Sequence, residues 1–235
     1  MSTFDIIIQA RMGSTRLPGK TLLPFGSSTV LEYLVDRARA LGGARQVIVA
    51  TTTHASDDAI ERVCKKNGYA IFRGSAENVL DRYYQAAKKF DSNLIVRVTA
   101  DNPFTDFSAV RALTQVLVNE HLDYVRNVAS LPVGAGCEAF TFAALTRAIR
   151  AATHAYEKEH VTPYFYKTAP DLFKQRDVSA PATADSEHVR LTLDTPTDYE
   201  RLIKIEKEFH GKALMVTTAE LVDYVTNHPI IHHAS

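Results

Sequence analysis

Short apolar runs alternate along the chain with longer segments in which apolar residues recur every three or four positions. The short runs predict buried β-strands, and the helical spacing predicts amphipathic helices. The expected strands are residues 4–8, 46–50, 70–72, 94–98 and 123–125. The expected helices are residues 30–41, between a Ser28 N-cap and a Gly42-Gly43 stop, then 56–67, 79–89 and 108–119. This alternation predicts an α/β fold.

Strands that alternate with helices imply right-handed crossovers and a mostly parallel sheet covered by helices. In sheets of this kind, ligands bind outside the carboxyl ends of the strands. The loops that follow the predicted strands are therefore where chemistry is expected.

The regular alternation of predicted strands and helices ends at about residue 128, after which the elements become shorter and less regular. The later elements are loops at 131–136 and 181–185, helices at 142–152 and 160–166, strands at 173–178 and 189–193, and a helix from Thr195 to about 209. We interpret residues 1–235 as a single domain in which about 128–188 elaborate one core.

Charge and cysteine content narrow the class of protein. The 27 basic and 27 acidic residues balance, so no global field attracts nucleic acid or an anionic membrane. No apolar run approaches the ~20 residues of a membrane span, and the first residues lack the features of a signal peptide. Cys64 and Cys137 have no C-x-x-C spacing and fit reduced thiols. These features predict a cytoplasmic protein that binds neither nucleic acid nor membrane.

A cationic loop follows the first predicted strand. Between Gln9 and Lys20 it holds three cations, two glycines and two hydroxyl side chains. Glycines let backbone N–H groups approach a phosphate chain, and the cations neutralise its charge. The segment is therefore a candidate triphosphate-binding loop.

A P-loop is the specific alternative for this segment. That motif requires a glycine, four residues, and then Gly-Lys-Ser or Gly-Lys-Thr. Here five residues separate Gly13 from Gly19-Lys20-Thr21, and Pro18 directly precedes the second glycine. Since the geometry of a P-loop depends on its length, we interpret this segment as a different kind of loop.

Two aspartates occupy matching positions at the ends of predicted strands. Asp101 follows residues 94–98, Asp194 follows residues 189–193, and each is followed by one residue and then proline. Two carboxylates together with substrate phosphates are a usual way to hold Mg²⁺. A turn or helix cap is the alternative, but Thr195 is the better cap for the helix that starts at Pro196. Asp194 is thus left free for another role.

Two further segments contain candidate residues with competing explanations. Arg73, Ser75 and Asn78 follow the third strand and are candidates for contacts with base, ribose or phosphate. A helix start capped by Ser75 or Asn78 explains them equally well. For His160, packing or capping is favoured over a role as an acid or base.

Taken together, these segments resemble the cytidylyltransferase family of spore-coat polysaccharide biosynthesis proteins, which is related to CMP-Kdo and CMP-acylneuraminate synthetases. The most specific pieces are Ile8-Gln-Ala-Arg-Met-Gly-Ser-Thr-Arg-Leu-Pro-Gly-Lys20 and Leu191-Thr-Leu-Asp-Thr-Pro196. The other matching pieces are residues 49–52 with Asp57-Asp58, 73–83, 98–103 and 159–163. They follow one another in order over nearly the whole chain.

The resemblance implies a Rossmann-like nucleotidyltransferase fold with CTP at the strand ends and a homodimer formed through about 128–188. It implies triphosphate contacts from Arg11, Ser14, Arg16 and Lys20, and a Mg²⁺ ion on Asp101 and Asp194. The full set of residues assigned to catalysis is Arg11, Arg16 and Lys20. The residues assigned to nucleotide binding are Gln9, Ala10, Gly13, Ser14, Thr51, Arg73, Ser75 and Asn78.

The expected activity is transfer of CMP from CTP to a sugar or sugar-like acceptor, with release of pyrophosphate, in activated-sugar synthesis for surface polysaccharide. Two departures concern the acceptor: Thr99 stands where the Kdo-type enzymes have glutamine, and Asn102 stands where spore-coat-type sequences often have cysteine. The alternatives are a P-loop-like small-molecule kinase, which would leave a nucleoside diphosphate, and a non-catalytic nucleotide-binding protein.

Overall fold

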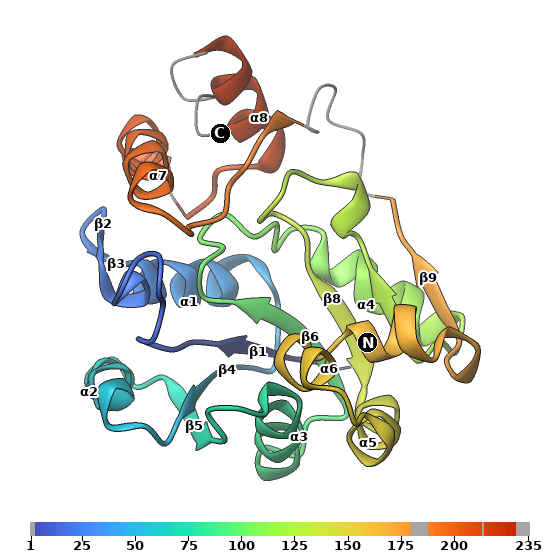
Figure 1. Ribbon diagram of the computed structural model, residues 1–235. Coiled ribbons are helices and arrows are strands. Elements are labelled where there is room, and N and C mark those ends of the chain that lie inside the picture. The colour runs from blue at the N-terminus through green and yellow to red at the C-terminus, as the bar shows by residue number, and fades with distance from the viewer. Residues whose placement is uncertain (1–2, 180–187, 213, 229–235) are drawn as a thin grey trace.

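The computed structural model describes residues 3–179, 188–212 and 214–228, and its centre is a seven-stranded sheet (Figure 1). The strand order is β5-β4-β1-β6-β8-β7-β9, and only β8 runs antiparallel to its neighbours. The strands of this sheet are β1 (Asp5–Gln9), β4 (Gln46–Thr52), β5 (Ala70–Gly74), β6 (Leu94–Thr99), β7 (Tyr124–Arg126), β8 (Glu138–Thr141) and β9 (Gln175–Asp177). A small hairpin is formed by β2 (Pro24–Phe25) and β3 (Ser28–Thr29). The predicted mostly parallel α/β architecture is confirmed.

Helices cover both faces of the sheet (Figure 1). They are α1 (Val30–Leu41), α2 (Asp58–Lys66), α3 (Val79–Lys89), α4 (Val110–Asn119), α5 (Phe142–Ala151), α6 (Ala155–His160), α7 (Pro196–Glu208) and α8 (Thr218–Asn227). Helices α1 and α4 pack on one face, and α3 and α5 pack on the other. Helices α7 and α8 extend the α1 side through a third apolar cluster.

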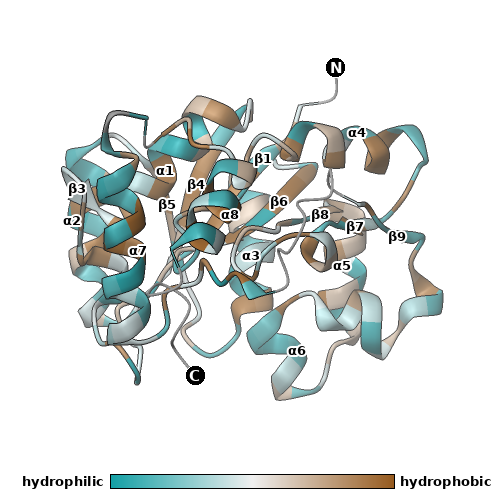
Figure 2. Ribbon diagram, turned by 90° about the horizontal axis from the view of Figure 1, so that it is seen from above, coloured by the Kyte–Doolittle hydropathy of each residue, from teal (hydrophilic) through white to brown (hydrophobic). Residues whose placement is uncertain are grey.

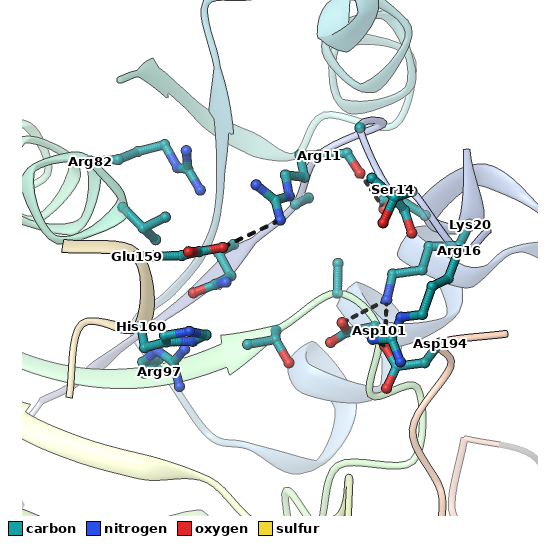
Figure 3. Close-up of a pocket in the computed structure, with 18 residues that line it drawn as sticks. Arg11, Ser14, Arg16, Lys20, Arg82, Arg97, Asp101, Glu159, His160 and Asp194 are labelled. Atoms are coloured by element: carbon teal, nitrogen blue, oxygen red, sulfur yellow. Dashed lines mark hydrogen bonds and ion pairs between the residues drawn. The ribbon is translucent and has the colours of Figure 1, made fainter. Parts of the chain in front are cut away.

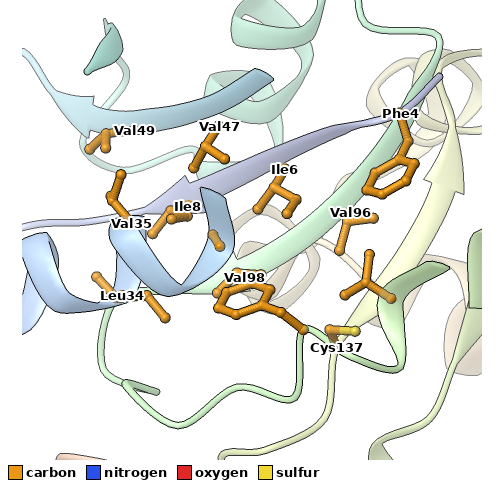
Figure 4. Packing of buried hydrophobic residues seen from close by; sticks show 14 of the residues in the cluster. Phe4, Ile6, Ile8, Leu34, Val35, Val47, Val49, Val96, Val98 and Cys137 are labelled. Atoms are coloured by element: carbon orange, nitrogen blue, oxygen red, sulfur yellow. The ribbon is translucent and has the colours of Figure 1, made fainter. Parts of the chain in front are cut away.

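The central strand β1 shows why this sequence forms a covered sheet. Successive side chains of a strand point to opposite faces, so Ile6 and Ile8 face α1 while Ile7 faces α3. All three are fully buried. Figure 4 shows Ile6 and Ile8 packed with valines of β4 and β6 and with Leu34 and Val35 of α1. In Figure 2 the middle strands are coloured as hydrophobic, and the flanking helices carry residues of both kinds.

Several predicted elements differ from the observed ones. The N-cap of α1 is Thr29 and not Ser28, because the Thr29 side chain and Glu32 form a reciprocal capping box. The helix expected at 160–166 is interrupted after His160, where Val161 has a positive φ of 69°. A single turn of π-helix, Tyr164–Thr168, follows this break. The loop expected at 181–185 lies outside the described residues.

The two largest differences concern strand β8 and residues 189–193. Strand β8 was not predicted, because it is only four residues long and begins with the charged residue Glu138. The expected strand at 189–193 was wrong: the segment is extended and mostly buried, but within the described parts of the chain its pairing is a single bridge between Val133 and Arg190. Its apolar side chains pack against α7 and α8 instead of joining the sheet.

The cap of α7 matches its prediction. The Thr195 side chain accepts a hydrogen bond from the backbone N–H of Asp198, and the Asp198 carboxylate accepts from the backbone N–H of Thr195, with Pro196 at the first helical position. Asp194 therefore takes no part in the cap through its side chain.

Replacing Thr195 with alanine should destabilise the fold by about 1 kcal/mol, the usual loss for an N-cap. Thermal denaturation should show a fall in melting temperature of roughly 2–4 °C. Thr197→Ala, an exposed position in the first turn of the same helix, is the matched control and should leave the melting temperature nearly unchanged. An equal fall in both variants would contradict this division of roles.

None of the helices in the described part of the chain has the length and apolar character needed to span a bilayer. Both cysteines are buried and unpaired. Burial raises the pKa of the Cys64 thiol to about 12, with nearby Glu61 adding to the shift. Both thiols lie in the apolar cluster on the α1 face of the sheet and serve its packing.

Candidate functional site

A cavity of about 380 Å³ opens where β1 and β6 end, and polar side chains line most of it (Figure 3). This is the carboxyl edge at which a parallel sheet is expected to bind its ligand. The sequence-predicted residues that line it are Gln9, Ala10, Arg11, Gly13, Ser14, Arg16, Lys20, Asp101 and Asp194. The structure thus brings the candidate loop and both candidate metal ligands together.

The loop after β1 is folded back on itself by backbone hydrogen bonds. The N–H groups of Ser14 and Gly19 both donate to the carbonyl oxygen of Met12, at 3.0 and 3.1 Å. Gly19 has a φ of 72°, a left-handed conformation that glycine adopts without a steric penalty. The Met12 N–H donates to Asp57 Oδ1 at 2.7 Å and anchors the loop to the segment after β4.

Lys20 is the centre of the ionic contacts in the cavity. Its Nζ donates to Asp101 Oδ2 at 2.8 Å, to Asp194 Oδ1 at 3.1 Å and to the carbonyl oxygen of Leu193 at 2.7 Å. Arg16 contacts the same Asp194 oxygen at 2.9 Å but is largely exposed. Lys20 is mostly buried, so its contacts with the two carboxylates are weakly screened by solvent.

Asp101 and Asp194 meet although only one of them follows a strand of the sheet. Asp101 lies just beyond β6, as predicted. Asp194 reaches it because the Leu193 N–H donates to the carbonyl oxygen of Asp101 at 2.8 Å, which ties the extended segment 189–193 to the end of β6. The two aspartates are therefore close, as predicted, but a backbone hydrogen bond and not strand pairing brings them together.

The two carboxylates fit a divalent cation. Each places an oxygen within 3.1 Å of the Lys20 ammonium, so they already share one positive charge at one point. Among the described residues there is no group of three or more acidic, histidine or cysteine side chains that could hold a metal. Two carboxylates suit Mg²⁺ when substrate phosphates and water supply its other ligands.

A second group of polar residues lines the opposite part of the cavity. Figure 3 shows Arg82, Arg97, Glu159 and His160 on one side and the lysine with its two aspartates on the other. Arg11 lies between the two groups and approaches Glu159 at 3.9 Å. The cavity therefore has two chemically distinct ends.

Arg97 is fixed by a buried network. Its guanidinium contacts Glu138 Oε2 at 2.6 Å, and the hydroxyls of Tyr124 and Thr162 also donate to the Glu138 carboxylate. Burial alone would lower the pKa of Arg97, but attraction to Glu138 outweighs it and the pKa is raised. Sequence reasoning missed this residue. Its signal was the single charged residue inside the apolar run of residues 94–98.

Four residues predicted to bind the nucleotide do not line the cavity. Arg73 is held by Asp58 at 2.7 Å and Glu61 at 2.5 Å, and Asn78 Oδ1 caps α3 by accepting from the Asp81 N–H. The Ser75 hydroxyl accepts from the Asn78 N–H. The hydroxyl of Thr51 is buried and has no hydrogen-bond partner among the described residues. Their contacts in the structure support the chain locally, and their role towards a nucleotide stays a prediction.

Comparison with known proteins identifies the family. The sequence model of the family described as "Cytidylyltransferase" matches residues 6–222. The chain belongs to the cytidylyltransferase family. Among curated proteins, it is 35% identical to the spore coat polysaccharide biosynthesis protein SpsF of Bacillus subtilis, over 97% of this chain and 96% of that protein. The family resemblance inferred from the motifs is confirmed.

Solved structures agree with this assignment. A cytidylyltransferase from Leptospira borgpetersenii superposes with a TM-score of 0.91 at 32% identity, over 100% of this chain and 98% of that one. A CMP:2-keto-3-deoxy-manno-octonic acid synthetase complexed with CTP has a TM-score of 0.65 at 17% identity, over 88% of this chain and 99% of that one. The second likeness shows the nucleotidyltransferase fold of this cytidylyltransferase.

Proposed function

We propose that this cytidylyltransferase transfers CMP from CTP to a sugar or sugar-like acceptor, releases pyrophosphate, and uses Mg²⁺. The observation that carries the proposal is the convergence of Asp101 and Asp194 on Lys20 beside the cationic loop. This places charge neutralisation for a triphosphate next to a pair of metal-binding carboxylates.

In the proposed reaction, an acceptor hydroxyl oxygen forms a bond to the α-phosphorus of CTP and its proton is lost to solvent, while the bond from that phosphorus to pyrophosphate breaks. Such a transfer needs positioning and charge stabilisation more than covalent help from the protein. Arg16 and Lys20 would bind the leaving pyrophosphate and stabilise its negative charge. Asp101 and Asp194 would hold Mg²⁺, and the bound ion would supply a positive charge that polarises the α-phosphate.

A screen for pyrophosphate release tests the proposal directly. Purified protein would be incubated with CTP, Mg²⁺ and a panel of sugar acids, sugar phosphates and neutral sugars. We expect pyrophosphate and a CMP-linked product with at least one acceptor. A nucleoside diphosphate as the product would favour the kinase alternative, and CTP binding without any turnover would favour a non-catalytic protein.

The preference of the protein for cytosine over other bases can be tested without knowing the acceptor. In the presence of Mg²⁺, CTP should raise the melting temperature more than ATP, GTP or UTP, because a ligand that binds only the native state stabilises it. At about 100 times the dissociation constant, the stabilisation is about 2.7 kcal/mol. Differential scanning fluorimetry measures this shift. An equal or larger shift with ATP would contradict the cytidine assignment.

We further propose that the protein is a cytoplasmic homodimer that contributes an activated sugar to a surface polysaccharide. The elaborated region at about 128–188 is the proposed interface, and it exposes the large apolar side chains of Tyr156 and Leu172. Light scattering would measure the mass of the protein in solution. A monomer at micromolar concentration would contradict the dimer.

A further inference from the structure

We infer that Asp57 is a positioning residue for the proposed transfer, and that it holds the cationic loop after β1 in the conformation that binds the triphosphate. The inference rests on the proposed function and adds a residue that does not line the cavity. Asp57 touches neither the nucleotide nor the acceptor in this proposal. It acts through the backbone of Met12, the residue onto which the loop folds back.

Asp57 joins two neighbouring strand ends through one buried carboxylate. It lies in the short turn Ala55–Asp57 between β4 and α2 and is only 1% exposed. Its Oδ1 accepts from the Met12 N–H at 2.7 Å, and its Oδ2 accepts from the N–H and the hydroxyl of Thr52. The carboxylate therefore connects the end of β4 to the loop after β1.

The donors that surround this carboxylate are neutral. In the part of the chain that the structure describes, they are backbone N–H groups and hydroxyls, and no cation forms an ion pair with Asp57. Burying a charge that no cation compensates costs more free energy than burying a neutral acceptor. Hydrogen bonds to a charged acceptor are, however, about twice as strong as those to a neutral one. The carboxylate is therefore better explained by a need to fix the Met12 N–H than by stability alone.

Met12 passes this anchor on to the rest of the loop. Its carbonyl oxygen accepts from the N–H groups of Ser14 and Gly19 at 3.0 and 3.1 Å. Arg16 lies within the segment that these two bonds close, and Lys20 directly follows it. The positions of both cations therefore depend on the peptide groups of Met12.

Asp57 provides a fixed point because its own segment is braced. Arg73 Nε donates to the carbonyl oxygen of Thr52 at 2.9 Å, and another nitrogen of the same guanidinium donates to that of His54 at 3.0 Å. Two carboxylates of α2 hold this guanidinium from the other side. The turn that carries Asp57 is thus tied to β5 and to α2.

The anchor has a consequence for binding. Arg16 and Lys20 both approach the same oxygen of Asp194, at 2.9 and 3.1 Å, so the two cations are held close together in spite of their repulsion. Ordering a loop before its ligand arrives removes a cost that binding would otherwise carry. Charges that need no rearrangement also stabilise a transition state more effectively. Loss of the anchor should therefore weaken the triphosphate and slow the transfer, and it should affect the CMP part less.

The first test compares variants that break opposite sides of the Asp57 carboxylate. Asp57→Ala releases Met12, whereas Thr52→Val removes the hydroxyl contacts to Asp57 and His54 and keeps the anchor of the loop. Both changes should lower the melting temperature. The dissociation constants of CTP, pyrophosphate and CMP would be measured by isothermal titration calorimetry with Mg²⁺.

In Asp57→Ala, the dissociation constants of CTP and pyrophosphate should rise by about 10-fold and kcat should fall by about 10- to 100-fold, the scale of a misplaced catalytic group. The dissociation constant of CMP should change by less than about threefold, because the proposed contacts of Arg16 and Lys20 are to the leaving pyrophosphate. Thr52→Val should bind all three ligands as the unmodified protein does. Equal weakening of CTP in both variants would overturn the inference, because affinity would then follow stability.

The second test measures the loop without any ligand. Amide hydrogen exchange in peptides that cover residues 10–20 should become about 10-fold faster in Asp57→Ala, because a local opening becomes easier when its anchor is lost. Exchange in β6 serves as the internal reference, and Thr52→Val is the matched control. Exchange in the loop that rises no more than exchange in β6 would show that Asp57 does not hold the loop.

Asp57→Asn is the conservative variant. The Thr52 hydroxyl can accept from the new amide nitrogen but the Met12 N–H cannot, so the amide oxygen should turn towards Met12. This variant should recover most of the CTP affinity lost in Asp57→Ala. Affinity as low as in Asp57→Ala would overturn the proposed anchor.

The double variant Asp57→Ala/Thr52→Val is a second form of the first test, because it leaves no Thr52 hydroxyl buried without its acceptor. It should show the same weakening of CTP as Asp57→Ala. If neither of these variants folds, Asp57 supports the whole fold and not the loop in particular, and the inference is overturned.

The two proposals fail in different ways. If the unmodified protein neither binds CTP nor releases pyrophosphate with any acceptor, the proposed function fails, and hydrogen exchange still decides whether Asp57 holds the loop. If Asp57→Ala binds and turns over CTP normally, the proposed function stands and the positioning role of Asp57 fails.

Discussion

Asp101→Asn and Asp194→Asn are each expected to remove most of the Mg²⁺-dependent turnover, and the double variant is expected to be little worse than either single one. The two carboxylates contact one cation, Lys20 Nζ, at 2.8 and 3.1 Å. Residues that act as one unit lose their function together, so their effects do not add. Steady-state rates of pyrophosphate release, measured over a range of Mg²⁺ concentrations, provide the test.

Asp106→Asn is a matched control, because Asp106 follows the same loop after β6 but contacts Ser108 and Thr218 and lies outside this cavity. It should keep normal turnover and normal Mg²⁺ dependence. Losses that add in the double variant, each with its own Mg²⁺ dependence, would show that the aspartates do not share an ion.

Lys20→Ala should raise the activation free energy for kcat/KM by roughly 2–4 kcal/mol, the scale of losing one preorganised charge contact in the transition state. The expected fall in rate is therefore about 30- to 1000-fold. In the ligand-free protein the same change leaves Asp101 and Asp194 facing each other without the shared ammonium. Like charges brought together favour uptake of a cation, so Mg²⁺ alone should stabilise Lys20→Ala more than the unmodified protein.

Lys65→Ala is the control for this variant. Lys65 is an exposed lysine of α2 that pairs with Glu61 on the same helix, and exposed pairs contribute little. It should change neither the rate nor the response to Mg²⁺. Near-normal turnover of Lys20→Ala would mean that the triphosphate binds elsewhere.

The parallel half of the sheet could be predicted from the sequence because each of its strands is an apolar run bounded by a helix. Strands β1, β4, β5 and β6 begin within one residue of their predicted starts. The prediction failed where a buried apolar segment does not pair as a strand, and where a strand carries a charged residue. Residues 189–193 are as apolar as a central strand, yet they are buried against helices. Strand β8 contains a charge because Glu138 pairs with Arg97 inside the protein.

The candidate site was predictable where its residues are neighbours in sequence. The loop from Gln9 to Lys20 forms a local unit, and its composition indicates its chemistry. Arg97 and Arg82 are different, because a lone arginine in a strand or on a helix face gives no sign of the cavity it lines. Only the packing of α3 against the strands brings them to one place. Conversely, Arg73 had a plausible position but is engaged by Asp58 and Glu61.

Different parts of the chain supply the residues at the two ends of the cavity. The parallel strands β1 and β6 carry the cationic loop and Asp101, whereas β8 and the following segments supply Glu138 and Thr162, which orient Arg97. Substitutions at Glu138 or Thr162 would therefore change how Arg97 is held while leaving the cationic loop and Asp101 in place. The two ends of the cavity are therefore built by different parts of the chain, so that the surroundings of Arg97 can change by substitution while the loop after β1 stays the same.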